Sequence, residues 1–280
     1  RCFTIHSVAE VEDFKRLHAK EPQDEVIIDL NGKTNERDIY TIISQVYPLN
    51  VEICVVPRLY DMLTGAASIQ DVGDVPLVRI TEHKMSDCGL CVKRACDVVM
   101  ALASMVVLSP VYLIVALSVR CSSKGPVIYK QERIGLHGKP FMILKFRTMT
   151  DHAEQGVPRL SSDDDPRITR LGHILRKYRI DELPQMWNVL RGDMSVVGPR
   201  PERRFFINQI EQVAPYYCLI YRIRPGLTSW GPVKVGYTDT MDKMVRRLNY
   251  DIVYMENMSI RLDMKILLFT IGVILDGKGK

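Results

Sequence analysis

An uncharged run of 22 residues, residues 98–119, constrains this chain more than any other segment, and Ser109 and Pro110 lie at its centre. A hydrocarbon core about 30 Å thick is crossed by about 20 apolar residues in one helix. Pro110 lacks an N–H group and its ring collides with the carbonyl four residues earlier, so we expect the helix to kink or break there. A buried core helix with an ordinary proline kink is the competing interpretation of the run.

Cations flank the run on both sides: Lys93 and Arg94 precede it, and Arg120 and Lys124 follow it. Because cytoplasmic segments carry the excess of Lys and Arg, this pattern favours the same, cytoplasmic side for both ends. We therefore predict a re-entrant helix over about residues 92–120 that dips into one leaflet and contacts membrane lipid. A site at that level suits a substrate that is itself a lipid.

Charge divides the chain into an acidic first part and a basic second part. Residues 1–92 carry a net charge of −6, which leaves +11 for the remainder. We predict two domains, residues 1–85 and residues 86–280, and the opening Arg1 indicates a piece of a longer protein. In the first domain, helical and strand patterns alternate, which predicts parallel βαβ units. The strands are expected at residues 25–30, 51–56 and 75–80.

The second domain leads a basic stretch directly into the acid pair Asp181-Glu182. Residues 120–180 contain 13 Lys and Arg against 6 Asp and Glu, and we expect both carboxylates to stay ionised in that field. Adjacent side chains do not share one helix face, so one acid can attack while the other holds a divalent cation. Mg²⁺ takes one or two carboxylates together with phosphate oxygens. The competing interpretation is that Asp181 only caps a helix with Pro184 in its first turn.

Five short motifs follow the apolar run. In chain order they are KFRTM (145–149), DPRITRLG (165–172), DELPQ (181–185), GDMSVVGPRPE (192–202) and RPG (224–226). Together they closely resemble the bacterial sugar transferase family, the monotopic phosphoglycosyl transferases, over about residues 93–280. Residues 1–85 resemble the tail of the Rossmann-like module of the longer members. The expected fold class is α/β: an α+β catalytic domain with a re-entrant membrane helix, preceded by a partial βαβ module.

The resemblance implies roles for individual residues. Asp181 is the expected nucleophile and Glu182 the expected Mg²⁺ ligand. Ser109 and Pro110 match the family's break in the re-entrant helix. Three arginines match positions that contact phosphate or product: Arg176, Arg200 and Arg224.

For two further pairs of residues, the sequence supports both a functional and a purely structural role. Lys145 and Arg147 fall in an alternating strand pattern, so they either contact phosphate or are solvated charges on an edge strand. Asp251 and Tyr254 fall where the family has a late Asp and Tyr, but a shared helix face explains them equally well.

The implied reaction transfers a sugar 1-phosphate from a nucleoside diphosphate sugar, with a UDP-hexose favoured, to polyprenol (undecaprenyl) phosphate. It releases UMP by way of an aspartyl phosphosugar and begins the synthesis of an exopolysaccharide, capsule or O-antigen. The implied location is the bacterial inner membrane, with the catalytic domain on its cytoplasmic face. The sequence is also compatible with a homo-oligomer and does not determine the oligomeric state.

Two other classes of function compete with this one. The first is a non-catalytic membrane scaffold that binds anionic lipid or a polysaccharide-assembly partner. The second is nucleic-acid binding, which only the basic charge supports. Because no recognisable nucleic-acid-reading motif is present, we expect no nucleic-acid partner.

Overall fold

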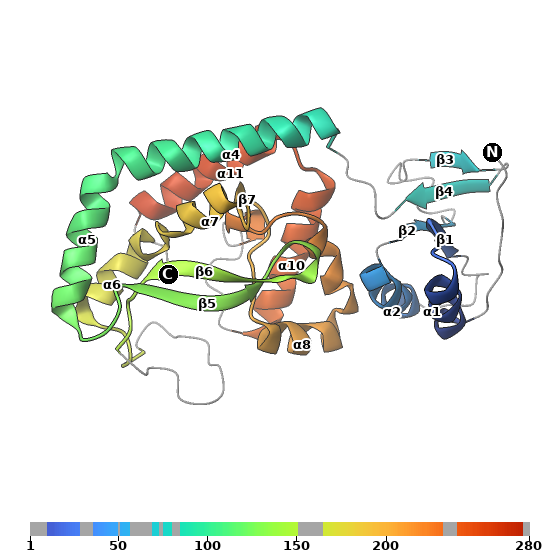
Figure 1. The fold of residues 1–280 in the computed structure, drawn as a ribbon, viewed down its shortest axis with the longest axis horizontal. Helices are drawn as coiled ribbons and strands as arrows, with labels where there is room; N and C mark the ends of the chain where they lie inside the picture. Colours follow the sequence, from blue (N-terminus) through green and yellow to red (C-terminus); the bar gives the residue numbers. More distant parts are fainter. Residues whose placement is uncertain are drawn as a thin grey trace. The chain divides into compact units, whose positions relative to one another are not determined.

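The chain folds into two compact units (Figure 1). One contains Arg1–His83 with Pro215–Leu219, and the other contains Lys84–Ala214 with Ile220–Lys280. The computed structural model describes residues 10–28, 36–49, 51–56, 69–72, 75–79, 85–150, 165–231 and 240–276.

In its described residues, the smaller unit has a four-stranded sheet in the order β1-β2-β4-β3, together with two helices and a short 3-10 turn. Phe14 of the first helix, Ile43 of the second and Ile53 of the second strand are buried in one hydrophobic cluster. The elements are α1 (Val11–Lys20), β1 (Glu25–Ile28), α2 (Glu36–Val46), η1 (Tyr47–Leu49), β2 (Glu52–Val55), β3 (Ile69–Val72) and β4 (Val75–Arg79).

The prediction of a continuing parallel sheet is wrong at β4. The strands β1 and β2 pair in parallel, as the βαβ pattern predicts, but β4 pairs antiparallel with both β2 and β3. Only two residues separate β3 from β4. Such a connection joins antiparallel strands, whereas a parallel pair needs a crossover of about a dozen residues or more. The alternating pattern of the sequence also predicts a short helix near residues 59–63, which lies outside the described residues.

The apolar run forms two helices with a sharp bend between them. The first, α4, spans Asp87–Val107, and the second, α5, spans Ser109–Ser122. Their axes are bent by 64°, and Pro110 lies in the first turn of α5, where its missing N–H group costs no hydrogen bond. The break predicted at Ser109 and Pro110 is therefore present. Figure 1 shows α4 along the top of the unit and α5 bending from its end to run down the left side, beside α6.

The bent pair is not a buried core helix. Within the run, Val106 and Val107 are 72% and 73% exposed, and further apolar side chains of both helices are exposed as well. Among the described helices, none is long and apolar enough to cross a bilayer alone, and only this pair meets the criterion when its halves are joined. The alternative of an ordinary core helix therefore conflicts with the exposure of its apolar side chains.

The rest of the larger unit is a mixture of short strands and helices, which confirms the expected mixture of helix and sheet. The strands β5 (Ile128–Ile134) and β6 (Pro140–Phe146) form an antiparallel hairpin through η2 (Leu136–Gly138). A parallel pair joins β7 (Ser195–Val197) to β8 (Gly226–Thr228). Its described helical elements are α6 (Arg170–Lys177), η3 (Ile180–Glu182), α7 (Gln185–Arg191), α8 (Arg204–Val213), α10 (Met241–Glu256) and α11 (Ile260–Leu275). A further 3-10 element, η4 (Pro215–Arg222), is shared between the units, because Pro215–Leu219 belong to the smaller one.

Helix α6 packs closely against the residues that follow β6. A Cβ atom added to Gly172 in the first turn of α6 would lie 2.1 Å from the Thr148 carbonyl oxygen. Thr169 caps this helix, because its hydroxyl accepts the Gly172 N–H group at 2.9 Å. The glycine therefore permits an approach of backbone to backbone that positions the whole of α6.

Replacing Gly172 by alanine is predicted to destabilise the protein by about 1 to 3 kcal/mol, because the added methyl group overpacks this contact. The matched control is Gly272→Ala in α11, where a new Cβ atom meets nothing within 4 Å. That change is expected to stabilise by about 0.5 to 1 kcal/mol. Urea unfolding in detergent measures both, and equal effects of the two substitutions would contradict the close approach.

Candidate active site

Asp181 and Glu182 lie in a buried turn between α6 and α7. Arg179, just before η3, has the left-handed backbone φ 53°, ψ 24°, which reverses the chain and is uncommon outside glycine and asparagine. Helix α7 begins at Gln185 with Pro184 as its N-cap residue. The competing interpretation of Asp181 as a helix cap is therefore wrong.

Contacts from two sides hold this turn in place. Asn188 of α7 accepts the Leu144 N–H group at 3.0 Å and donates to the Met142 carbonyl oxygen at 2.8 Å, so α7 is fixed along β6. On the other side, the Tyr112 hydroxyl of α5 donates to the Leu183 carbonyl oxygen at 2.7 Å. The bent helix pair and the hairpin therefore meet at the acid pair.

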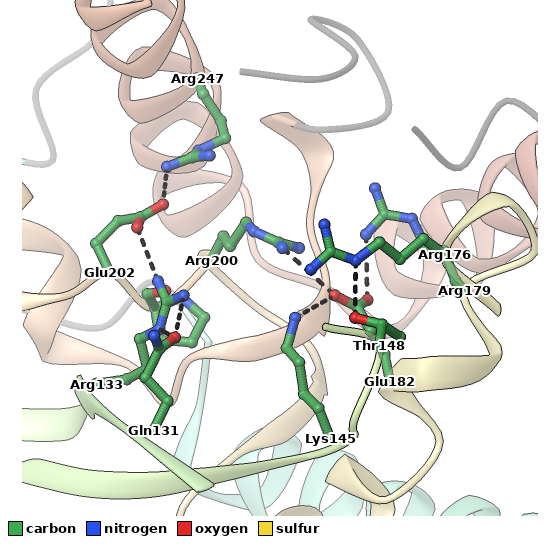
Figure 2. Close-up of polar contacts among 11 residues, drawn as sticks. Gln131, Arg133, Lys145, Thr148, Arg176, Arg179, Glu182, Arg200, Glu202 and Arg247 are labelled. Carbon is green, nitrogen blue, oxygen red and sulfur yellow. Dashed lines mark hydrogen bonds and ion pairs between the residues drawn. The ribbon is translucent and has the colours of Figure 1, made fainter. Parts of the chain in front are cut away.

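Three cations from separate segments surround the Glu182 carboxylate (Figure 2). Its Oε1 atom lies 2.9 Å from Lys145 Nζ of β6 and 3.3 Å from the guanidinium of Arg200, which follows β7. Its Oε2 atom lies 3.1 Å from the guanidinium of Arg179. Glu182 is only 6% exposed, and a buried charge of this kind is stable only when it is compensated.

The two acids titrate differently because their surroundings differ. Burial raises the pKa of Glu182, but Lys145, Arg179 and Arg200 outweigh it and hold that pKa well below its usual range. Burial, together with the charge of Glu182, raises the pKa of Asp181 to about 6, although the positive charge of Lys145 lowers it. The surrounding cations thus favour the ionised form of Glu182 strongly, whereas Asp181 is the acid that gains a proton as the pH falls through about 6.

Of the predicted phosphate-binding residues, Lys145, Arg176 and Arg200 gather at the acid pair. Arg176, on α6, donates from Nε to the Thr148 hydroxyl at 2.9 Å, and Figure 2 shows its side chain beside Glu182. Its positive charge also lowers the pKa of Asp181. These three cations come from β6, α6 and the segment after β7, so only the folded chain brings them together.

Arg147 does not join them, and its predicted contact with phosphate conflicts with its position. Its guanidinium donates to the carbonyl oxygens of Pro126 and Ser123, each at 2.6 Å. The strand β6 ends at Phe146, so the alternation that places Lys145 toward the acids does not extend to Arg147. Arg147 instead fixes the end of α5 to the hairpin.

Arg224 has a contact of a different kind. Its Nε atom donates to the Gly192 carbonyl oxygen at 3.0 Å, in the turn that ends α7. No hydrogen bond or ion pair joins Arg224 to the acid pair among the residues that the structure describes. Its role toward phosphate or product stays a prediction.

Sequence reasoning missed Arg179 and the buried ion pairs of Glu202. The i, i+3 spacing from Arg179 to Glu182 was a readable signal, but the left-handed backbone of an arginine is not. Glu202 pairs with Arg133 of β5 at 2.9 Å and also with Arg247 of α10 (Figure 2). These pairs anchor the segment that carries Arg200, two residues earlier.

The donor set at this site fits Mg²⁺ in number. Two adjacent carboxylates are present, and Mg²⁺ needs only one or two when phosphate oxygens supply other positions. No cluster of three or more His, Cys, Asp or Glu side chains that could hold a metal occurs among the described residues. Glu182 Oε2 has one ion-pair partner, Arg179, and a carboxylate oxygen can accept two. A Mg²⁺ ion at this position would therefore need phosphate oxygens of a bound substrate as further ligands.

The arrangement of the acid pair and its cations indicates a class of protein. A buried acid pair among cations suits a group-transfer site for phosphate esters, and it lies on a unit that carries a bent, exposed apolar helix pair. Comparison with known families agrees, because residues 88–277 match the model of the family described as bacterial sugar transferase. The chain belongs to the bacterial sugar transferase family.

Individual relatives are similar over most of this chain. A UDP-N-acetylgalactosamine-undecaprenyl-phosphate N-acetylgalactosaminephosphotransferase of Aeromonas hydrophila is 34% identical over 91% of this chain and 60% of its own length. A UDP-glucose:undecaprenyl-phosphate glucose-1-phosphate transferase of Escherichia coli (strain K12) is 34% identical over 82% of this chain and 50% of its own. One of the same name from Caulobacter vibrioides is 42% identical over 65% of this chain and 69% of its own. The chain thus spans about half to two thirds of these curated relatives.

Asp181→Asn is predicted to stabilise the protein at pH 8 by about 1 to 3 kcal/mol, because the raised pKa means that burying the charged carboxylate costs stability. That cost is present above the folded-state pKa of about 6. It disappears as the pH falls toward the unfolded-state value, so the gain should shrink between pH 6 and pH 4. Unfolding by urea across this range measures it, and a variant less stable than the parent at pH 8 would contradict the burial cost.

Proposed function

We propose that this chain transfers a sugar 1-phosphate from a nucleoside diphosphate sugar, with UDP-hexose favoured, to polyprenol (undecaprenyl) phosphate. One observation carries the proposal: Asp181 is buried beside Glu182, where Lys145, Arg179 and Arg200 converge. An anionic nucleophile next to that many cations suits attack on a diphosphate, whose own charge would otherwise repel it. The printed names of the similar proteins, with UDP-sugars and undecaprenyl phosphate, support the same reaction.

In the first step, a carboxylate oxygen of Asp181 attacks the phosphorus that bears the sugar. The bond from this phosphorus to the bridging oxygen breaks, and the nucleoside monophosphate leaves with that oxygen and its electron pair. The Asp181 carboxylate is then joined to the sugar phosphate as an acyl phosphate. Asp181 is suited to the attack because, among the described residues, no hydrogen bond or ion pair occupies its carboxylate. The cations around Glu182 stabilise the charge that develops on the leaving group.

In the second step, an oxygen of the polyprenol phosphate attacks the same phosphorus. The bond to Asp181 breaks, which restores its carboxylate and leaves a polyprenyl diphosphate sugar. The lipid phosphate is already ionised at neutral pH, so no general base is needed. The turn's contact with α5, through Tyr112 and Leu183, brings the acid pair next to the apolar helices that would meet the lipid.

We further propose that Mg²⁺ accompanies the diphosphate and that the broken helix lies in one leaflet, on the cytoplasmic face of the bacterial inner membrane. Mg²⁺ would offset phosphate charge, with Glu182 as the carboxylate that holds it. The exposed apolar side chains of the bent pair support the membrane location. The initiating step in the synthesis of an exopolysaccharide, capsule or O-antigen would then take place at this membrane face.

Asp181→Asn is expected to lower UMP release from a UDP-sugar with polyprenol phosphate by about 10³-fold or more, because the attacking oxygen is lost. The control, Asp242→Asn, changes an exposed carboxylate in the first turn of α10 and should keep the parent's rate. A scaffold without catalysis predicts no release from either protein. Retained turnover in Asp181→Asn would exclude the proposed nucleophile.

The rate of UMP release in a single turnover without lipid acceptor is expected to fall as the pH drops through about 6, because protonated Asp181 cannot attack. The diphosphate of the donor has no ionisation in this range. In Lys145→Met the midpoint should move to higher pH, since Lys145 lowers the pKa of Asp181. A profile that stays flat from pH 5 to pH 8, in both proteins, would refute the assignment.

A further inference from the structure

A closed ring of polar contacts joins the first half of the bent helix pair to the strand that precedes Arg200. Lys93 of α4 donates from Nζ to the Val197 carbonyl oxygen at 3.0 Å and lies 2.5 Å from Asp263 Oδ2 of α11. The Tyr254 hydroxyl of α10 donates to Asp263 Oδ1 at 2.6 Å and reaches the same Val197 oxygen at 3.3 Å. Two helices thus contact one carbonyl oxygen, through Lys93 and Tyr254, and Asp263 of a third helix joins these two side chains to each other.

Asp97, one helical turn beyond Lys93, holds the other end of the same strand. Its Oδ2 atom accepts the Ser195 hydroxyl at 2.7 Å, and its Oδ1 atom accepts the Val196 N–H group at 3.1 Å. Asp97 is buried, so this is an interior contact of the unit. All three residues of β7 are therefore attached to α4.

Lys93 and Arg94 consequently do not act as the head-group cations that the flanking pattern indicates. The Lys93 side chain is 11% exposed and lies toward Asp263. Arg94 donates to the carbonyl oxygens of Val189 at 2.8 Å and Leu190 at 3.0 Å, which are in the last turn of α7. A cation there also complements the helix dipole. Both charges are used inside the protein.

The segment after β7 is short and closely packed, so the position of Val197 determines where Arg200 lies. A Cβ atom on Gly198 would lie 2.4 Å from the Arg224 carbonyl oxygen, which leaves no room for a side chain. The Pro199 carbonyl oxygen accepts the Gly226 N–H group at 2.9 Å. Arg200 follows at once, with its guanidinium 3.3 Å from Glu182 Oε1.

We propose that Lys93, with Asp263, is a positioning residue that fixes Arg200 at the acid pair by holding the Val197 carbonyl group. The helix that would lie in the lipid and the cation that meets the diphosphate are then parts of one rigid connection. The inference rests on the proposed function, because turnover is one of its readouts.

The test removes the buried ion pair as a neutral pair, Lys93→Met with Asp263→Asn, so that no buried charge is left without its partner. The matched control is Lys124→Met, which removes an exposed cation at the other end of the apolar run. We expect the paired variant to lower kcat by about 10- to 100-fold, the size of effect that a misplaced group of about 1 Å produces. Its sedimentation with vesicles of anionic phospholipid should equal that of the parent, and the control should keep kcat.

The decisive comparison repeats the paired substitution in an Arg200→Ala background. If Lys93 acts through Arg200, the paired substitution should then change kcat by less than about threefold, because the group that it positions is gone. The same fold-loss in both backgrounds would overturn the proposal, and so would an unchanged kcat in the parent background. A loss of vesicle binding without a change in kcat would assign Lys93 to the head groups instead.

Hydrogen–deuterium exchange over residues 195–203 separates this proposal from the proposed function. Faster exchange there in the paired variant, with parent-like exchange in α6, is the expected result even if the parent releases no UMP. Unchanged exchange over residues 195–203 would contradict the attachment of β7. If the paired variant does not fold, Asp97→Asn provides the same kinetic and exchange comparisons, because it weakens the other attachment of β7.

Discussion

The larger unit depends on how one buried carboxylate is neutralised. Glu182 can remain ionised in the interior only because Lys145, Arg179 and Arg200 reach it from β6, the turn after α6 and the segment after β7. Each of these cations would in turn be costly to bury without Glu182. Mutual compensation therefore fixes three segments around one point. Asp181, the neighbour of that point, lacks such a set of partners and keeps a raised pKa of about 6.

The same unit connects this charged centre to the bent helix pair by direct contacts. Helix α4 holds β7 through Lys93 and Asp97, and it holds the end of α7 through Arg94. Helix α5 reaches the turn of the acid pair through Tyr112. The pair α4 and α5 thus exposes apolar side chains on one side and makes specific polar contacts with the rest of the unit on the other. This arrangement explains how a lipid phosphate and a soluble sugar nucleotide could be brought to the same carboxylate.

Sequence alone could predict what depends on local covalent chemistry. A proline in an apolar helix predicts a break wherever the chain folds, and an acid pair after a basic stretch predicts compensated carboxylates. It could not predict features that depend on which neighbour a side chain meets. Lys93 and Arg94 fit a head-group role equally well until their inward contacts are known. The alternating pattern groups Arg147 with Lys145, because it does not reveal that the strand ends at Phe146.

The proposed function requires Asp181 to carry the sugar phosphate during turnover. Mass spectrometry of the protein incubated with a UDP-sugar and Mg²⁺, without lipid acceptor, detects this covalent intermediate. We expect one added sugar phosphate on the peptide that contains Asp181, and polyprenol phosphate should then remove it. An adduct on that peptide in Asp181→Asn, or steady turnover by the parent protein with no adduct at any time, would contradict it.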